Sequence, residues 1–296
     1  MRVSVVVTTY NRPDALRIVL HALAAQHDPR FEVIVADDGS GPATEQMLGE
    51  FERGRFAPGL ERLLHAWQPD EGFRAAAARN MAVAASAGSY LVFLDGDCVP
   101  RPDFVARHRM LAERGCLVSG SRVLMSEALT VDALAAGTAS ASASASASAS
   151  ALHGRGLSYW LAQRLRGRTN KVVPLIRIAD SPLRRYRSVQ WRRIKSCNLA
   201  VWRSDFEAVD GFDERFVGWG HEDADLVLRL ARAGVRRKSG AFSTEVFHLW
   251  HCENPRALES ANRRRVEERF ASGVVRSEVG LSSHPNPGER VHAVIG

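Results

Sequence analysis

The chain has 296 residues and a formal net charge of +7, and arginine supplies almost all of its cations. Its 45% hydrophobic and 25% charged residues match soluble globular proteins, which excludes disorder along the whole chain. No apolar run reaches the 18 or so residues that a membrane-spanning helix needs. The positive charge favours anionic partners such as nucleotides, phospholipid surfaces or nucleic acid.

The first hundred residues alternate strand and helix patterns. Strands are predicted at 3–9, 31–40, 60–69 and 89–100, and helices at 14–26, 44–51 and 75–87. This alternation predicts an α/β protein with a doubly wound, Rossmann-like mixed sheet. Ligands of such sheets lie beyond the carboxyl ends of the strands, where TTYN (8–11), Asp37-Asp38 and DGD (95–97) all fall.

Low-complexity and charged sequence interrupts the middle of the chain. Residues 139–151 read ASASASASASASA, which predicts a surface linker, and an arginine-rich tract follows over 155–193. Globular character resumes after this tract. We therefore expect one domain over 1–255 that is interrupted by an insert over about 138–193.

The chain is expected to end in a helix and tail. A last strand is predicted at 241–249, and a charged helix at 256–270. The residues after this helix are predicted to be loop, so 256–296 forms a segment outside the domain.

The four cysteines contain no CxxC pair, which argues against a zinc site or a disulfide framework. A reduced, cytoplasmic setting fits this usage. The N-terminal stretch MRVSVVVTTYN lacks the longer apolar segment and cleavage site of a signal peptide, and is interpreted as the first strand.

Two motifs carry groups that bind metal ions. Asp95 and Asp97 lie two apart after a strand, so both carboxylates can face one divalent cation, although turn-forming acids are the ordinary alternative. His248 and His251 lie three apart and offer nitrogen ligands to Mn²⁺ or a similar ion. Two unrelated histidines would explain HLWH by itself, and the joint occurrence of both motifs favours a metal site.

The stretch GWGHEDADL gathers three acids beside an indole at a predicted helix start. Free N–H groups there favour acids and explain one or two of them without function. They do not explain Trp219 between two glycines, since an indole beside a carboxylate is suited to docking a sugar ring. Glu222 and Asp223 are candidates for a general base, and Asp225 is expected to be a helix-start acid that faces away.

Five segments together resemble one family. They are VSVVVTTYNRPDALRIVLHAL, VIVADDGS, FRAAAARN, VFLDGDCVP and NLAVWRSDFEAVDGFDERFVGWGHEDADLVLRLARAG. In this order they resemble inverting family-two glycosyltransferases of the A-type (nucleotide-diphospho-sugar transferase) fold. The last segment is similar to the carboxy-terminal domain of β-1,4-galactosyltransferases and N-acetylgalactosaminyltransferases. The resemblance implies a nucleotide-binding part over about 1–125 and an acceptor and catalytic part over about 195–255.

The resemblance implies a uridine pocket at the first strand ends. Thr8, Tyr10 and Asp38 would line it with Arg12 close by, and Asp38 would accept a hydrogen bond from uracil. Arg74 aligns with an arginine that contacts the base or phosphate, and Arg79 lies further along the same helix.

The resemblance also assigns the reacting groups. Asp97 and His251 would bind the metal, Mn²⁺ or Mg²⁺, and His248 falls where galactosyltransferases carry a further ligand. Asp95 would lie nearer the ribose or sugar while belonging to the same metal motif. Trp219 would border donor sugar and acceptor, Glu222 would bind a hydroxyl, and Asp223 would be the catalytic base. His221 departs from the pattern, which has glycine there.

The expected function is metal-dependent, inverting transfer of a hexose or N-acetylhexosamine from a UDP-sugar to a saccharide or glycolipid acceptor in bacterial surface polysaccharide synthesis. A sugar-phosphate nucleotidyltransferase is the first alternative, but TTYNRPDA lacks its glycine-rich loop. A non-catalytic basic module that grips nucleic acid is the second, but no nucleic-acid motif accompanies the basic tract, and we expect no nucleic-acid partner. For the 155–193 tract, peripheral contact with the cytoplasmic face of the inner membrane and a plain solvated face both stay open.

Overall fold

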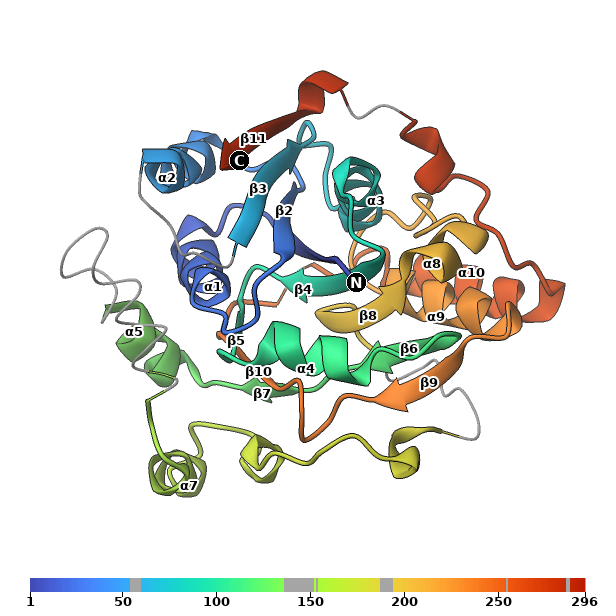
Figure 1. The fold of residues 1–296 in the computed structure, drawn as a ribbon. Helices are drawn as coiled ribbons and strands as arrows, with labels where there is room; N and C mark the ends of the chain where they lie inside the picture. Colours follow the sequence, from blue (N-terminus) through green and yellow to red (C-terminus); the bar gives the residue numbers. More distant parts are fainter. Residues whose placement is uncertain are drawn as a thin grey trace.

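The structure is a computed structural model and has an α/β architecture (Figure 1). It describes residues 1–53, 60–135, 152, 154–186, 194–253, 255–285 and 288–295. The Ala-Ser repeat and the end of the arginine-rich tract lie outside these residues. Within them, no helix is long and apolar enough to cross a membrane.

A mixed sheet of eight strands forms the centre of the described molecule, in the order β11-β3-β2-β1-β4-β8-β6-β9. Its strands are β1 (Val3–Thr9), β2 (Phe31–Asp37), β3 (Leu60–Trp67), β4 (Tyr90–Asp95), β6 (Cys116–Ser119), β8 (Asn198–Trp202), β9 (Arg236–Ser239) and β11 (Val291–Ile295). The first four strands pair in parallel, whereas β8 and β11 run antiparallel to their neighbours β4 and β3. The predicted doubly wound mixed sheet is therefore confirmed.

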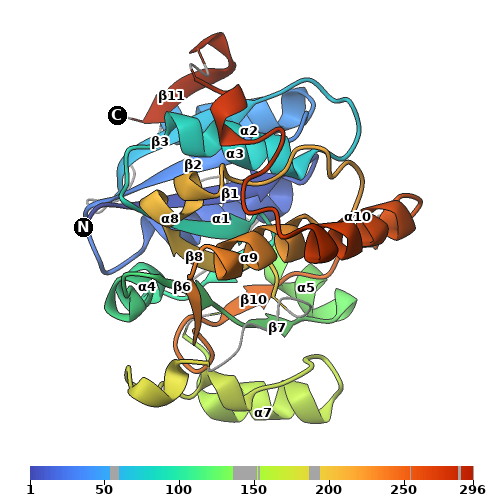
Figure 2. The same cartoon turned by 90° about the vertical axis from the view of Figure 1, so that its right-hand side faces the viewer.

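Helices cover both faces of this sheet (Figures 1 and 2). The labelled helices of the described residues are α1 (Pro13–Ala24), α2 (Pro42–Arg53), α3 (Ala75–Ala85), α4 (Phe104–Leu111), α5 (Glu127–Ala135), α7 (Leu157–Leu165), α8 (Arg203–Ala208), α9 (Glu222–Arg232) and α10 (Glu259–Ser272). Of these, α7 lies apart from the main sheet. Alternate side chains of β1 enter two different cores: Val5 and Val7 pack with α1, and Val6 packs with α3 and α9. Because a strand that is buried on both faces needs apolar residues at every position, VSVVV has no polar alternation beyond Ser4.

A second, smaller sheet brings distant segments together. It contains β5 (Cys98–Pro100), β10 (Val246–His248) and β7 (Arg122–Leu124), with β10 in the middle. The register of β10 with β5 places His248 opposite Cys98, directly after Asp97. The predicted strand at 89–100 is thus two strands in two sheets, separated at Gly96 and Asp97.

The C-terminal segment packs as part of the molecule. The predicted charged helix is α10, and it packs beside α9 (Figure 2). The prediction of loop for the residues after it is wrong at β11, which pairs antiparallel with β3 at the sheet edge. The described residues also contain short 3₁₀-helices at Val173–Leu175, Pro182–Arg184, Leu281–Ser283 and Gly288–Arg290.

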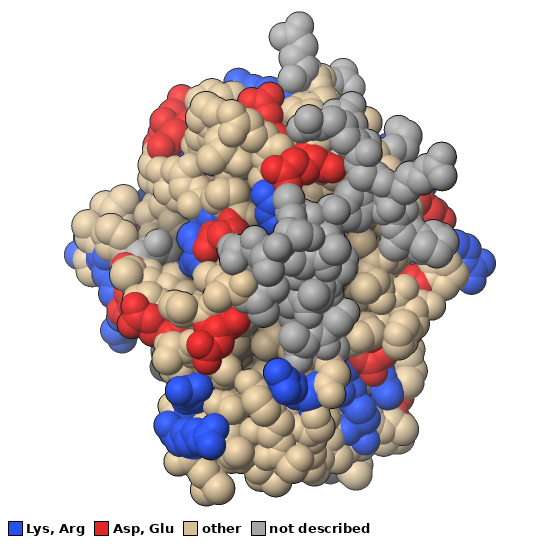
Figure 3. All heavy atoms as spheres, turned by 90° about the vertical axis from the view of Figure 1, so that its left-hand side faces the viewer, with Lys and Arg blue, Asp and Glu red and all other residues tan. Residues whose placement is uncertain are grey.

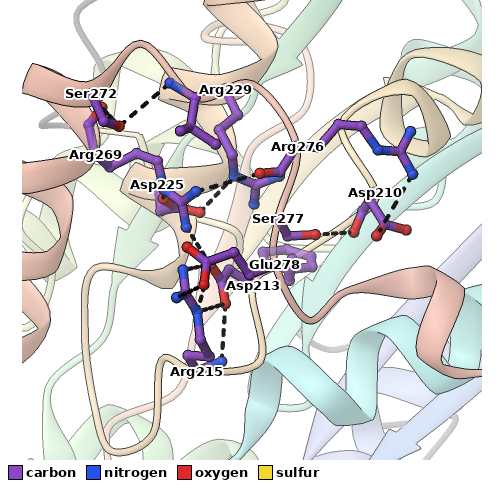
Figure 4. Close-up of polar contacts among 12 residues, drawn as sticks. Asp210, Asp213, Arg215, Asp225, Arg229, Arg269, Ser272, Arg276, Ser277 and Glu278 are labelled. Atoms are coloured by element: carbon purple, nitrogen blue, oxygen red, sulfur yellow. Dashed lines mark hydrogen bonds and ion pairs between the residues drawn. The ribbon is translucent and has the colours of Figure 1, made fainter.

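A buried ionic network fixes α10 to α9 (Figure 4). Asp225 accepts from Arg229 at 2.7 Å and from Arg269 at 2.9 Å. Arg269 also pairs with Asp213, which accepts from Arg215 at 2.7 Å. Asp225 thus faces away from the acids Glu222 and Asp223, as expected, but it is a fully buried anchor and not a simple helix-start acid.

We expect Arg269→Met to lower the free energy of unfolding by about 3 kcal/mol, because two buried aspartates then lose a cation. Urea denaturation measures the change. The matched control is Arg263→Met on the same helix, whose exposed pair with Glu267 should contribute less than about 0.5 kcal/mol. Equal losses in the two variants would show that the buried network does not fix α10.

Candidate active site

The carboxyl ends of β1, β2 and β4 meet at one edge of the main sheet. The strand registers place Thr8 opposite Asp95 and Thr9 opposite Asp37. Asp38 follows β2 directly, and its backbone N–H donates to the Thr9 carbonyl over 3.0 Å. The polar groups predicted at these strand ends are therefore neighbours in space.

Asp38 is buried, and both of its carboxylate oxygens accept hydrogen bonds. Oδ1 accepts from Gln68 Nε2 at 2.6 Å, and Oδ2 accepts from the backbone N–H of Arg74 at 2.7 Å. Burial raises the pKa of Asp38 to about 6 in spite of these bonds. The sequence gives no motif for Gln68, whose position at the end of β3 is its one signal.

Three predicted side chains lie at the rim of this edge and pair with other acids. The Tyr10 hydroxyl donates to Asp70 at 2.8 Å, and Arg12 pairs with Asp14 at 3.3 Å. Arg74 directs its guanidinium to Glu71. A ligand that needs Arg12 or Arg74 would have to draw them away from these carboxylates.

Arg79 is the buried connection between the strand ends and α9. Its Nε donates to Thr8 Oγ1 at 2.9 Å, and its Nη2 donates to Asp95 Oδ1 at 3.2 Å. Its Nη1 donates to Glu222 Oε1 at 3.2 Å. The guanidinium therefore holds two carboxylates from opposite halves of the chain.

Asp97, His248 and His251 form a group that could hold a metal ion. One ligand atom from each lies within 4.8 Å of the others, and the Asp97 carboxylate is 3.2 Å from His251 Nε2 and 3.7 Å from His248 Nε2. Burial lowers the pKa of His248, which favours the neutral imidazole that binds metals. One carboxylate oxygen and two imidazole nitrogens are ligands for a divalent first-row transition metal. The structure leaves Asp95 outside this group and against Arg79.

Glu222 and Asp223 begin α9, and both are buried. Burial and the neighbouring Glu222 carboxylate raise the pKa of Asp223 to about 6, and Oδ2 of Asp223 accepts from the Ser196 N–H at 3.3 Å. Oε2 of Glu222 is buried and has no hydrogen-bond partner within the described part of the chain. Such an atom is costly to leave unpaired, so it marks a place for a donor from a ligand.

A pocket of about 210 Å³ opens beside Asp223. Its lining includes Lys195, Trp219, His221, Glu259 and Arg263. The pocket therefore lies between the start of α9 and the first half of α10. A carboxylate with a raised pKa at the wall of a pocket can remove a proton from a bound hydroxyl.

Trp219 lies between two cations that the sequence did not single out. Lys195 Nζ is 5.7 Å and Arg256 Cζ is 4.8 Å from the centroid of its indole. Gly218 and Gly220 adopt φ of 79° and 100°, a conformation that glycine adopts without steric cost. His221 also has positive φ, at 76°, which is rare for a residue other than glycine.

Two family profiles match the chain. The profile of glycosyl transferase family 2 matches residues 4–138, and a galactosyltransferase profile, described as its N-terminal domain, matches residues 181–252. The first covers the β1, β2 and β4 ends with Asp97. The second covers Asp223 and both histidines. The gap between the two profiles contains the Ala-Ser repeat and much of the arginine-rich tract.

Curated relatives are similar over most of this chain. Hyaluronan synthase of Pasteurella multocida is 27% identical over 93% of the chain, which matches 27% of that protein. Validoxylamine A glucosyltransferase of Streptomyces hygroscopicus subsp. jinggangensis is 30% identical over 78% of the chain and 52% of that protein. The chain thus spans about half or less of the length of these relatives.

Solved structures share the fold. TarS of S. aureus in complex with UDP aligns over 96% of this chain and 68% of that one, with 15% identity and a TM-score of 0.55. The mannosyltransferase PcManGT of Pyrobaculum calidifontis in complex with GDP-Man and Mn²⁺ aligns over 97% of this chain and 69% of that one, with 17% identity and the same TM-score. The fold is that of A-type glycosyltransferases.

We expect Asp97→Ala and His251→Ala each to weaken Mn²⁺ binding by more than about tenfold, since each removes one of three ligand atoms. Electron paramagnetic resonance of free Mn²⁺ during a titration measures the affinity. His284→Ala is the control, because His284 pairs with Glu214 elsewhere. Unchanged affinity in the two ligand variants would refute this metal site.

Proposed function

We propose, on the premise that the chain carries a glycosyl transferase family 2 domain, that it transfers a sugar from a nucleotide-sugar donor to an acceptor hydroxyl. The donor is a UDP-linked hexose or N-acetylhexosamine. The acceptor is a saccharide or glycolipid of a bacterial surface polysaccharide. The transfer inverts the anomeric carbon and depends on Mn²⁺ or Mg²⁺.

One chain of contacts carries the proposal. Asp97, beside both histidines, lies two residues after Asp95, and Asp95 accepts from Arg79. Arg79 also donates to Glu222, the neighbour of Asp223. These contacts support a single site for the metal-binding group and the candidate base, which a metal-dependent transfer requires.

The donor would bind across the strand ends. Asp38, which follows β2, offers a buried carboxylate for the uracil ring. Thr8 and Tyr10 lie at the end of the neighbouring strand β1. Asp97, His248 and His251 would hold the divalent cation. That cation supplies electrostatic stabilisation of the charge that develops on the departing diphosphate. Arg12 and Arg74 can add positive charge after they leave Asp14 and Glu71.

The acceptor would bind in the pocket beside Asp223. The Asp223 carboxylate removes the proton of the attacking hydroxyl as its bond to the anomeric carbon forms. The unpaired Oε2 of Glu222 accepts a hydrogen bond from a sugar hydroxyl, while Oε1 stays with Arg79. Attack from the face opposite the leaving diphosphate gives inversion without a covalent enzyme intermediate.

The relatives support the substrate class at a coarse level. Hyaluronan synthase is named for a polysaccharide product and validoxylamine A glucosyltransferase for glucosyl transfer. Fold neighbours hold UDP in one case and GDP-Man with Mn²⁺ in the other. A screen of UDP- and GDP-sugars for hydrolysis in the presence of Mn²⁺ therefore tests which donor is used. Release of the nucleotide is the quantity measured. Release from a UDP-hexose or UDP-N-acetylhexosamine is expected, and no release from any UDP-sugar would overturn the proposal.

We expect Asp223→Asn to bind the donor normally but to lower kcat by about 10²- to 10⁴-fold, because the base is lost while its shape is kept. Transfer assays and donor titration separate the two effects. Asp225→Asn is not a suitable control, because Asp225 is a stability anchor. Asp28→Asn, which lies before the amino end of β2 and pairs with Arg109, is the matched control and should retain activity. Near-native transfer by Asp223→Asn would place the base elsewhere.

The raised pKa of Asp223 predicts the acid limb of the pH profile. Asp223 must be ionised to act as a base, so kcat at saturating donor should fall about tenfold per pH unit below about pH 6. An unperturbed aspartate would move this fall to below about pH 4. Initial rates between pH 4 and 8, with the fold monitored by circular dichroism, distinguish these outcomes.

A further inference from the structure

The outer face of α7 exposes a row of leucines. Leu157, Leu161 and Leu165 lie four residues apart, so they share one side of the helix. Their exposed fractions are 46%, 46% and 89%. Single exposed apolar residues are common on proteins, but three in register on one helix form a stripe that water solvates poorly.

The opposite face of α7 fixes the direction of this stripe. Trp160 is buried and stacks on Phe247 of β10, with centroids 4.4 Å apart and planes at 14°. Gln163 is also buried. Because the helix is held against the small sheet through these residues, the leucines cannot turn inward without losing that packing.

The segment after α7 also exposes apolar side chains. Residues 154–186 lie together along the lower edge of the molecule in both views (Figures 1 and 2). Further exposed apolar side chains of this segment are Val173, Ile176, Ile178 and Leu183. Leu183, at 95% exposure, is almost fully in solvent. We call these residues together with the three α7 leucines the α7 surface.

Arginines flank the leucine row without acidic partners. Arg155, Arg164 and Arg166 are exposed, and none forms an ion pair with a described residue. Asp180 is the single acid in residues 154–186, and it pairs with Lys238. Figure 3 shows one face of the molecule, and Lys and Arg side chains gather on its lower part. In Figure 1, α7 lies at this level.

Other arginines of the basic tract have structural roles. Arg177 donates to the Ser243 carbonyl at 2.6 Å and pairs with Asp103. Arg184 is buried and donates to four backbone carbonyls. Within the described part of the tract, the arginines that neither form an ion pair nor donate to backbone carbonyls are therefore those around α7.

We propose that the α7 surface docks on an anionic lipid bilayer. Exposed leucines can enter the boundary between headgroups and acyl chains, while arginines beside them contact lipid phosphates. A second copy of this chain fits less well, because facing copies would bring the unpaired arginines of both together. The proposal does not depend on the sugar-transfer activity, since it rests on another part of the molecule.

Co-sedimentation of the full chain with vesicles tests the proposal. We expect binding to phosphatidylcholine vesicles that contain phosphatidylglycerol and about tenfold weaker partitioning to phosphatidylcholine alone. Leu161→Ser with Leu165→Ser, and Arg164→Glu with Arg166→Glu, should each lower the partition coefficient about tenfold or more. Phe270→Ser, which changes an exposed aromatic residue on α10, is the matched control and should bind like the native chain.

Thermal melting confirms that each variant is folded before its binding is compared. Equal binding by all variants, or no preference for phosphatidylglycerol, would overturn the proposal. Sedimentation velocity tests whether a second copy of the chain binds the α7 surface instead. A dimer that the Leu161→Ser and Leu165→Ser variant dissociates would assign the α7 surface to a second copy and would also overturn lipid docking.

Discussion

A buried guanidinium joins the two halves of the candidate site. Arg79 comes from α3, and it donates both to Asp95 and to Glu222, which lies 143 residues further along the chain. A buried cation between two carboxylates is tolerated because each charge compensates the others, so none of the three can leave without a large penalty. This contact fixes the first turn of α9, and with it Asp223, against the strand ends that carry Asp97. Arg79 therefore holds Asp95, at the end of β4, and Glu222, at the start of α9, close to each other.

Local patterns were sufficient wherever an element's own residues decide its structure. Strands β1, β2 and β4 are mostly apolar runs buried on both faces, and α1, α3 and α9 have helical spacing, so each was predicted within a few residues. The small sheet was missed although β5 and β10 fall inside the predicted strands at 89–100 and 241–249, because their pairing with each other and with the three-residue β7 depends on tertiary contacts. Likewise β11 was expected to be loop, since its pairing depends on the free edge of β3.

The candidate site likewise contains residues that motifs predicted and residues that only tertiary packing brings together. Motifs pointed to Asp97, His248 and His251, and the structure brings these three together. No motif pointed to Gln68, Lys195 or Arg256, because their places beside Asp38 and Trp219 follow from tertiary packing. The roles of the predicted residues remain predictions, and what the structure adds is which of them are neighbours.

The two edges of the main sheet end in short strands. On one side β11 pairs with β3 and is itself the edge, with five residues and a register shift between Ala293 and Ile295. On the other side β9 has four residues, RRKS, and Arg185 forms an isolated bridge to its Lys238. Short, irregular or basic edge strands discourage pairing with the sheet of another molecule. The C-terminal strand therefore replaces the longer edge of β3 with a shorter, irregular one, which is a poorer template for strand-to-strand aggregation.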